Sequence, residues 1–240
     1  MDLSLIIACY NEETVLEHSL KEIIMTLDST TFTYEIIFVD DYSTDNTPKL
    51  INFLCEKYKD KHFRFVLHNK NIGRGGTVTE GFRMAKGDII GYIDIDLEVH
   101  ARYIPSCVLA IKDGADVAIG FRVYKFDFRS IDRYIMSKGY NWLMRKMLGI
   151  NLKDTETGVK FFSRERILPI LDKIKDQGWF WDTEIMVQSY LRKYTIAEIP
   201  CLFVRRFDNV STVKGISDSI IYFKNLLRYR KVLENINRNT

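Results

Sequence analysis

The sequence predicts an α/β fold, in which a mostly parallel sheet is flanked by helices. Short β-branched apolar runs alternate with longer amphipathic runs, and this alternation is typical of parallel strands joined by helices. Polar, chemically active residues follow the first four apolar runs, where the carboxyl ends of parallel strands meet at one edge of the sheet. The 240 residues suffice for one well-buried domain.

The expected elements follow from that alternation. Strands are predicted at Leu3–Cys9, Glu35–Asp40, Phe63–His68, Ile89–Ile93 and Val117–Ile119. Helices are predicted at Glu13–Thr26, Thr44–Lys59, Gly76–Lys86 and Tyr103–Lys112, with right-handed crossovers. The second half is less regular: a helix from about Ile131 to Leu148, a loop at Asp154–Gly158, a strand at Val159–Ser163, two helices, the apolar run Ile199–Val204 and a basic amphipathic tail from Ile216.

Composition narrows the class of protein. With 46% hydrophobic and 28% charged residues the chain is globular, and a net charge of +3 is too small to indicate a nucleic-acid partner. The four cysteines are far apart and contain no C-x-x-C pair, so we expect buried thiols in a reducing compartment rather than zinc ligands or disulfides. No basic leader precedes Leu3 and no apolar run reaches about 18 residues, so neither a signal peptide nor a membrane span is expected.

The acidic sequence Asp94-Ile95-Asp96 ends the apolar run Ile89–Ile93. Two carboxylates that flank one residue can present oxygens to a hard cation, and Mg²⁺ or Mn²⁺ would then neutralise the charge of a substrate diphosphate. Glu98 is placed to join them directly or through water. A solvated acidic strand end would give the same short pattern, so the motif indicates a cation site only together with the other polar residues at this edge of the sheet.

Asp40 and Asp41 follow the second predicted strand. Two interpretations are open. These carboxylates accept hydrogen bonds from a nucleotide's base or ribose, or they belong with Ser43–Asp45 to a helix N-cap cluster.

A glycine-rich loop, Asn71–Gly76, follows the third predicted strand. Its glycines would let the backbone approach a phosphate, and a helix that begins near Gly76 would point N–H groups at that anion. Arg74 adds a positive charge. The loop lacks the G-x-x-x-x-G-K-[ST] pattern of ATPases.

Basic residues gather in the second half. Arg122 follows an apolar strand and therefore lies at the same sheet edge, where a guanidinium can bind a phosphate bidentately. A solvated basic surface is the competing interpretation. The first cluster also contains Arg129, Arg133, Lys138, Arg145 and Lys146, and the second contains Arg205, Arg206 and Lys214.

Asp182 follows the aromatic run Trp179–Trp181 and opens a predicted helix. It is either the N-cap of that helix or a general base that faces an acceptor.

Taken together, the segments Ile6–Glu12, Val39–Asp45 and Asp94–Leu97 resemble family 2 glycosyltransferases, which have the inverting, Rossmann-like GT-A fold. More narrowly, the chain resembles the polyprenyl- and dolichyl-phosphate sugar transferases, including the glucose and mannose synthases. The supporting pieces are Asn71–Gly76, Asp154–Lys160 and Glu198–Pro200 leading to Arg206 and Ser211. The resemblance covers Leu3 to Lys214, so we expect a GT-A domain over residues 1–214 and a basic amphipathic helix over residues 215–240.

The resemblance implies a role for particular positions. The donor nucleotide would contact Ala8, Tyr10, Glu12, Asp40, Asp41 and Arg74, with the Asp94-Ile95-Asp96 motif at its diphosphate. The cation would be held by Asp94, Asp96 and Glu98. The lipid phosphate and donor phosphates would meet Arg122, Arg133, Arg206 and Lys214. Two departures stand out: Glu98 replaces the glutamine of many relatives, and Ser211-Thr212 replaces their Ser-Lys, with Lys214 two places later.

The implied activity is metal-dependent, inverting transfer of a hexose from a nucleotide-diphosphate sugar to a polyprenyl or dolichyl phosphate. That acceptor is already anionic and needs no general base, whereas a glycan hydroxyl, the alternative acceptor, would need one, with Asp182 as the candidate. The Asn-x-Gly-basic-Gly-Gly loop resembles that of the glucose synthases slightly more than that of the mannose synthases, and this resemblance implies UDP-glucose rather than GDP-mannose as the donor. A non-catalytic nucleotide-sugar-binding module remains the alternative of another class, while a pyrophosphorylase would need an activation loop that the sequence lacks.

Membrane contact is a further expectation. The predicted 131–148 helix and the tail are basic and amphipathic, and such helices can lie in an anionic interface. The protein would then be cytoplasmic and peripheral, at the cytoplasmic face of a membrane. The same apolar sides would equally suit packing on the core, on a second copy or on a membrane-anchoring partner subunit. The apolar residues concerned are Tyr134, Ile135, Met136, Trp142, Leu143, Met144, Met147, Leu148, Ile220, Ile221, Phe223, Leu226 and Leu227.

Overall fold

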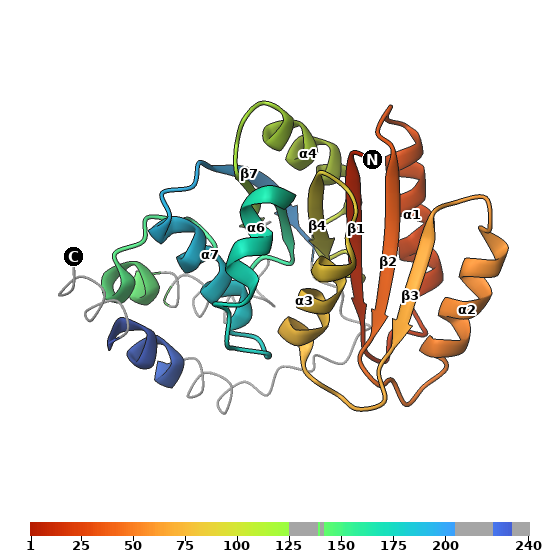
Figure 1. The fold of residues 1–240 in the computed structure, drawn as a ribbon, viewed down its shortest axis with the longest axis horizontal. Coiled ribbons are helices and arrows are strands. Elements are labelled where there is room, and N and C mark those ends of the chain that lie inside the picture. The colour runs from red at the N-terminus through yellow and green to blue at the C-terminus, as the bar shows by residue number, and fades with distance from the viewer. Residues whose placement is uncertain (125–138, 140–141, 205–222, 232–240) are drawn as a thin grey trace.

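The computed structural model describes residues 1–124, 139, 142–204 and 223–231. A mixed seven-stranded sheet forms its centre, in the order β3-β2-β1-β4-β6-β5-β7 (Figure 1). Only β6 among these strands runs antiparallel to its neighbours, so the mostly parallel prediction is confirmed. The strands are β1 (Leu3–Cys9), β2 (Tyr34–Asp40), β3 (Phe63–Leu67), β4 (Ile89–Ile93), β5 (Val117–Tyr124), β6 (Val159–Ser163) and β7 (Ile196–Phe203).

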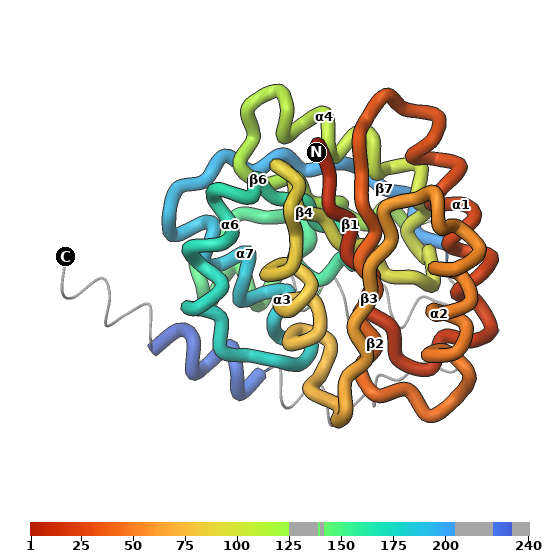
Figure 2. Tube along the Cα trace, turned by 45° about the vertical axis from the view of Figure 1, so that its right-hand side comes forward, coloured from red at the N-terminus to blue at the C-terminus, as the bar shows by residue number. Residues whose placement is uncertain are grey.

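Helices cover both faces of the sheet, as the tube in Figure 2 shows from a second direction. They are α1 (Leu16–Asp28), α2 (Thr47–Lys57), α3 (Arg74–Met84), α4 (Ile104–Lys112) after the short 3-10 helix η1 (Ala101–Tyr103), α6 (Arg164–Leu171) and α7 (Trp181–Leu191). Residues 142–148 and 223–231 are also helical. Helices α1, α2 and α4 share one core cluster, and α3, α6 and α7 share the other.

Strand β1 shows why the sequence folds into three layers. Leu3, Leu5 and Ile7 point into the cluster of α1, α2 and α4, while Ile6 points into the cluster of α3, α6 and α7. Successive side chains of a strand alternate between its faces, so a strand covered on both sides must be apolar throughout. All four side chains are fully buried.

Within the described residues, the structure confirms the predicted elements with small differences at their ends, whereas most of the predicted 131–148 helix and of the predicted tail over residues 215–240 lies outside them. The fifth strand was predicted to end at Ile119 but runs on to Tyr124, because its whole length pairs with β7. Helix α3 begins at Arg74 rather than near Gly76, with Gly73 as its N-cap at φ 89°. A positive φ is open to glycine without the steric cost of a Cβ, so Gly73 sets the start of the helix.

The helix of residues 223–231 packs on the same core cluster as residues 142–148. Leu226 and Tyr229 are buried there with Met144 and Leu148. In the described part of the chain, no helix combines the length and the apolar character that a membrane crossing requires. Cys9, Cys107 and Cys201 are buried and Cys55 is half-buried, all as free thiols, in agreement with the packing role predicted for them.

Candidate active site

The loops that follow β1 and β2 are joined at the carboxyl edge of the sheet. The Asn11 N–H donates to Ser43 Oγ at 2.9 Å, and Asn11 Oδ1 accepts the Thr44 N–H at 2.8 Å. One residue later, the Glu12 N–H donates to Thr47 Oγ1 at 2.7 Å. These bonds fix the two loops against each other and hold Glu12 at the edge.

Backbone strain concentrates at the same edge. Asn11, Tyr42 and Leu97 have φ values of 58°, 66° and 52°, and they follow β1, β2 and β4 respectively. Left-handed backbone costs energy for residues with a Cβ, above all for bulky ones such as tyrosine and leucine. Such strain gathers where a site requires a particular geometry. The edge predicted to carry function is therefore also where the fold accepts unfavourable conformations.

Asp40 and Asp41 bond to protein atoms. Asp40 accepts from the Ser43 N–H at 3.0 Å and from Ser43 Oγ. The buried Asp41 carboxylate accepts the N–H groups of Ile72 and Gly73 at 2.8 and 2.9 Å. The anion at the start of α3 is thus the Asp41 side chain. The ligand phosphate that the sequence predicts near this helix start stays a prediction, and the N–H groups of residues 72 and 73 are not free to hold it while they donate to Asp41.

The glycines of the 71–76 loop serve packing. An added Cβ would lie 2.5 Å from the Gln177 carbonyl oxygen at Gly73 and 2.4 Å from Trp181 Cβ at Gly75. The Gly76 N–H donates to the same Gln177 oxygen at 3.0 Å. The backbone of this loop does approach another group closely, but that group is the segment leading into α7.

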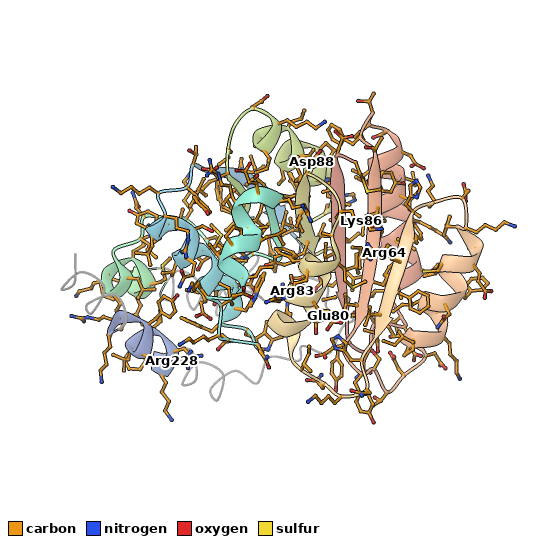
Figure 3. The ribbon with its side chains drawn as sticks, viewed as in Figure 1. Arg64, Glu80, Arg83, Lys86, Asp88 and Arg228 are labelled. Atoms are coloured by element: carbon orange, nitrogen blue, oxygen red, sulfur yellow. The ribbon has the colours of Figure 1, made fainter. Side chains whose placement is uncertain are left out.

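His68 continues the contacts of Asp41. Its Nδ1 lies 2.9 Å from Asp41 Oδ1, and its Nε2 lies 3.0 Å from Glu80 Oε2 on α3. Figure 3 labels Glu80 on this helix. The histidine joins two carboxylates across the start and middle of α3 and thereby supports the orientation of the loop that carries Arg74. Its role could not be inferred from the sequence, where it stands alone.

Arg74 joins two of the predicted site residues. Its Nη2 donates to Asp94 Oδ1 at 2.5 Å, Nε reaches the same oxygen at 3.2 Å, and Nη1 donates to Asp182 Oδ2. The guanidinium also lies over the rings of Tyr92 and Trp179, at 5.2 and 5.4 Å. Residues from three separate segments of the sequence therefore meet at the guanidinium of Arg74.

Asp182 is the most buried of the carboxylates that Arg74 contacts. It is 3% exposed, and its Oδ1 accepts from the Tyr92 hydroxyl and from Lys160 Nζ, the latter at 2.5 Å. The N-cap interpretation is wrong, because Phe180 precedes the first turn of α7 and Asp182 lies inside it. The Asp182 carboxylate thus has hydrogen-bond donors from three elements, namely Arg74, Lys160 and Tyr92.

Lys160 was not among the predicted site residues. Its side chain is fully buried, and burial lowers the pKa of its ammonium while Asp182 opposes that effect. The sequence does contain a sign of this role, because a lysine within the apolar strand Val159–Ser163 requires a buried counter-charge. Only the three-dimensional structure shows that Asp182 supplies it.

Acidic side chains accumulate beside Arg74. Burial, then the Asp94 charge, raises the pKa of Asp96 to about 7. Burial, then Asp96 and Asp94, raises the pKa of Glu12 to about 8. The raised pKa values show that these carboxyl groups oppose one another's ionisation, which a divalent cation would relieve, and their oxygens are the ligands that Mg²⁺ prefers. Among the residues described, however, no three His, Cys, Asp or Glu side chains converge as a cation site.

Gly158 gives Asp94 its place. The Asp94 N–H donates to the Gly158 carbonyl at 3.0 Å, and an added Cβ on Gly158 would lie 1.7 Å from Asp94 Oδ2. The carboxylate therefore rests on the Gly158 backbone, and every other residue at that position would push it away. The loop between residues 154 and 158 was predicted from its sequence, but this contact was not.

Arg122 lies within β5, two residues before its end. Its Nε and Nη2 donate to the two oxygens of Asp154 at 2.7 and 3.0 Å, and Nη2 lies 3.5 Å from Glu156 Oε2. Although burial opposes it, Arg122 lowers the pKa of Asp154. Burial raises the pKa of Glu156 to about 7. The bidentate geometry expected for a phosphate is thus made to a carboxylate.

The remaining predicted residues differ in placement. Ala8 is half-buried on β1, Tyr10 is exposed at its end, and Ile95 is buried between the two aspartates. The Glu98 N–H donates to Asp96 Oδ1 at 3.0 Å. Arg133, Arg206 and Lys214 lie outside the described residues.

We expect Asp41→Asn to lower the free energy of unfolding by about 1–3 kcal/mol, because it leaves a partly buried N–H of the 72–73 backbone without its charged acceptor. Urea unfolding at neutral pH measures the change. Asp60→Asn, on an exposed side chain, is the matched control and should be neutral. Equal stability of Asp41→Asn and the native chain would contradict this role.

Comparisons with known proteins agree with the geometry. Residues 4–171 match the family described as Glycosyl transferase family 2. Glycosyltransferase AglD of Haloferax volcanii is 31% identical over 83% of this chain and 32% of its own length. Dolichyl-phosphate beta-glucosyltransferases of Dictyostelium discoideum and Saccharomyces cerevisiae are 28% and 31% identical, over 95% and 82% of this chain and 73% and 65% of theirs. The chain thus spans about a third of AglD.

Solved structures show the same fold. Glucosyl-3-phosphoglycerate synthase from Mycobacterium tuberculosis, in complex with uridine diphosphate, superposes with a TM-score of 0.67 at 21% identity, over 96% of this chain and 80% of the synthase chain. Its complex with phosphoglyceric acid gives 0.70 at 20% identity, over 95% and 79% of the two chains. This likeness establishes the GT-A fold. With the family match over residues 4–171, it follows that the chain belongs to glycosyl transferase family 2.

Proposed function

We propose that this chain transfers a hexose from a nucleotide-diphosphate sugar, with UDP-glucose preferred over GDP-mannose, to a polyprenyl or dolichyl phosphate, with inversion. The observation that carries the proposal is the similarity to three proteins named dolichyl-phosphate beta-glucosyltransferase, from Dictyostelium, yeast and human, each over 82% or more of this chain. A cation, Mg²⁺ or Mn²⁺, held by Asp94 and Asp96 together with oxygens of the donor diphosphate would stabilise the charge of the departing diphosphate.

The environment of Asp182 supports a phosphate acceptor. A general base must have a lone pair within reach of the proton it removes. The Asp182 carboxylate instead accepts from Arg74, Lys160 and Tyr92 and is 3% exposed. A phosphate acceptor is ionised at neutral pH and attacks without a base, so catalysis then depends on orientation and charge stabilisation.

A glycan hydroxyl acceptor is the second candidate, and Asp182 would be its base. We expect turnover with polyprenyl phosphate to survive, at a reduced level, in the double variant Lys160→Met/Asp182→Asn, because removing both charges leaves neither one buried alone. Asp182→Asn by itself leaves Lys160 unpaired and should lose more stability, which thermal unfolding would measure. Complete loss of turnover in a folded double variant would support the base instead.

The first assay identifies donor and acceptor. We would incubate the protein with Mn²⁺ and UDP- or GDP-sugars, with and without a polyprenyl phosphate, and measure released nucleoside diphosphate and glycosylated lipid. We expect lipid-dependent turnover with UDP-glucose that disappears with EDTA and falls at least 100-fold in Asp96→Ala, since a lost charge contact to the leaving group has about this cost. Hydrolysis of the donor that does not depend on lipid would indicate a glycan as the acceptor. Nucleotide binding without turnover would favour a non-catalytic module.

Membrane contact is proposed for the helices of residues 142–148 and 223–231. Trp142 is 61% exposed, and Phe223 and Leu227 are also exposed, although Met144 and Leu226 pack into the core. Lysines and arginines accompany them, and exposed aromatic and basic residues together suit an anionic interface.

We expect Trp142→Ser/Phe223→Ser/Leu227→Ser to release the protein from anionic liposomes in co-sedimentation at moderate salt, because these side chains supply the inserted apolar area. The matched control is Met25→Ser/Phe53→Ser/Leu109→Ser, on exposed residues of α1, α2 and α4. Equal binding of both triple variants would contradict an interface at these helices.

A further inference from the structure

Asp94 already has a cationic partner in the structure, and that partner is part of the chain. Two nitrogens of Arg74 contact its Oδ1, at 2.5 and 3.2 Å. The same guanidinium donates to Asp182 through Nη1. Arg74 therefore bridges one carboxylate assigned to cation binding and one carboxylate that has no such assignment.

The two ends of this bridge are held differently. The Asp182 side chain is 4% exposed and is fixed by Lys160 and Tyr92, whereas the Asp94 side chain is 42% exposed. An ion pair is weakened by water at an exposed carboxylate and strengthened at a buried one. Of the two contacts of Arg74, the one to Asp94 is therefore the easier to exchange.

The surroundings keep Arg74 in place during such an exchange. Its guanidinium lies over the rings of Tyr92 and Trp179, and the N-cap of its helix, Gly73, packs closely against Gln177. Losing Asp94 would leave the guanidinium attached to Asp182 and to both rings. Nε and Nη2, which now serve Asp94, would become available to an anion at the same edge of the sheet.

We propose that Arg74 is a tethered counter-ion of Asp94, which it neutralises until a divalent cation and a diphosphate arrive together. This inference rests on the proposed function, which supplies both ligands. A cation alone has to compete with the guanidinium for the Asp94 carboxylate and remain beside its positive charge. A cation that arrives with a diphosphate brings compensating negative charge, and the N–H groups released from Asp94 gain new acceptors. Arg74 thereby couples cation binding to donor binding.

The test measures Mn²⁺ affinity without turnover. Electron paramagnetic resonance of unbound Mn²⁺ gives the dissociation constant with and without UDP, for the native chain, Arg74→Gln and Arg83→Gln. Arg83, labelled in Figure 3, lies on the same helix and pairs with the exposed Asp172, so it controls for the loss of one positive charge.

We expect Arg74→Gln to bind Mn²⁺ alone about 10-fold or more tighter than the native chain, since a charged hydrogen-bond partner of Asp94 has been removed. UDP should tighten Mn²⁺ binding strongly in the native chain and in Arg83→Gln, but much less in Arg74→Gln. Thermal unfolding reports whether Arg74→Gln is folded. Arg74→Lys serves if it is not, because one ammonium cannot bridge both carboxylates as the guanidinium does, and it should give an intermediate affinity.

Equal or weaker Mn²⁺ binding by folded Arg74→Gln overturns the inference and leaves the proposed function intact. If Arg74→Lys is the variant tested, a Mn²⁺ affinity equal to that of the native chain also overturns the inference. An equal gain of Mn²⁺ affinity in Arg83→Gln overturns it as well. A native chain that binds no Mn²⁺ even with UDP overturns the metal-dependent function and this inference with it.

Discussion

The requirement that buried charges be paired organises the candidate site. Lys160 lies on an interior strand, and a buried ammonium without a counter-charge would be strongly unfavourable. The Asp182 carboxylate on α7 supplies this counter-charge, and it also accepts a hydrogen bond from Arg74 on α3. Two helices and a strand that are far apart in the sequence are thereby held in one arrangement. The orientation of the exposed Asp94 carboxylate follows from this pairing.

The remaining features around the site maintain that arrangement by close packing. Asp41 holds the start of α3 through backbone N–H groups, and Gly73 and Gly75 let the loop press against the segment before α7. Gly158 provides the surface on which Asp94 rests. The glycines that resembled a ligand-binding loop in the sequence are therefore contacts within the protein, and the anion that the start of α3 binds is a side chain.

Much of the fold was predictable from local pattern. Apolar runs covered on both faces identify β1, β2 and β4 to within a residue, because a buried strand admits few polar residues. The full length of β5 was not predictable, since Phe121 to Tyr124 are strand only through pairing with β7. Within the site, Asp94 and Arg74 were found because they lie after strands.

The partners of the site residues depend on tertiary contacts, which the sequence does not reveal. Nothing near Lys160 in the chain indicates Asp182, and nothing near Arg122 distinguishes a phosphate from Asp154 as its bidentate partner. A guanidinium binds both oxyanions through the same geometry. Residue type therefore predicted the chemistry of these side chains correctly, while the identity of the bound group required the structure.

The interlocking of the 72–76 loop with residues 177–181 has a mechanical consequence. A hydrogen bond from Gly76 to Gln177 and the fit of Gly75 on Trp181 leave no room for one segment to slide past the other. Arg74 and Asp182 belong to these two segments, so they must travel together as a rigid unit whenever either segment shifts. A widening of the site that keeps these contacts would therefore have to take place elsewhere, as at the contact that Arg74 of this unit makes with Asp94 in the loop after β4.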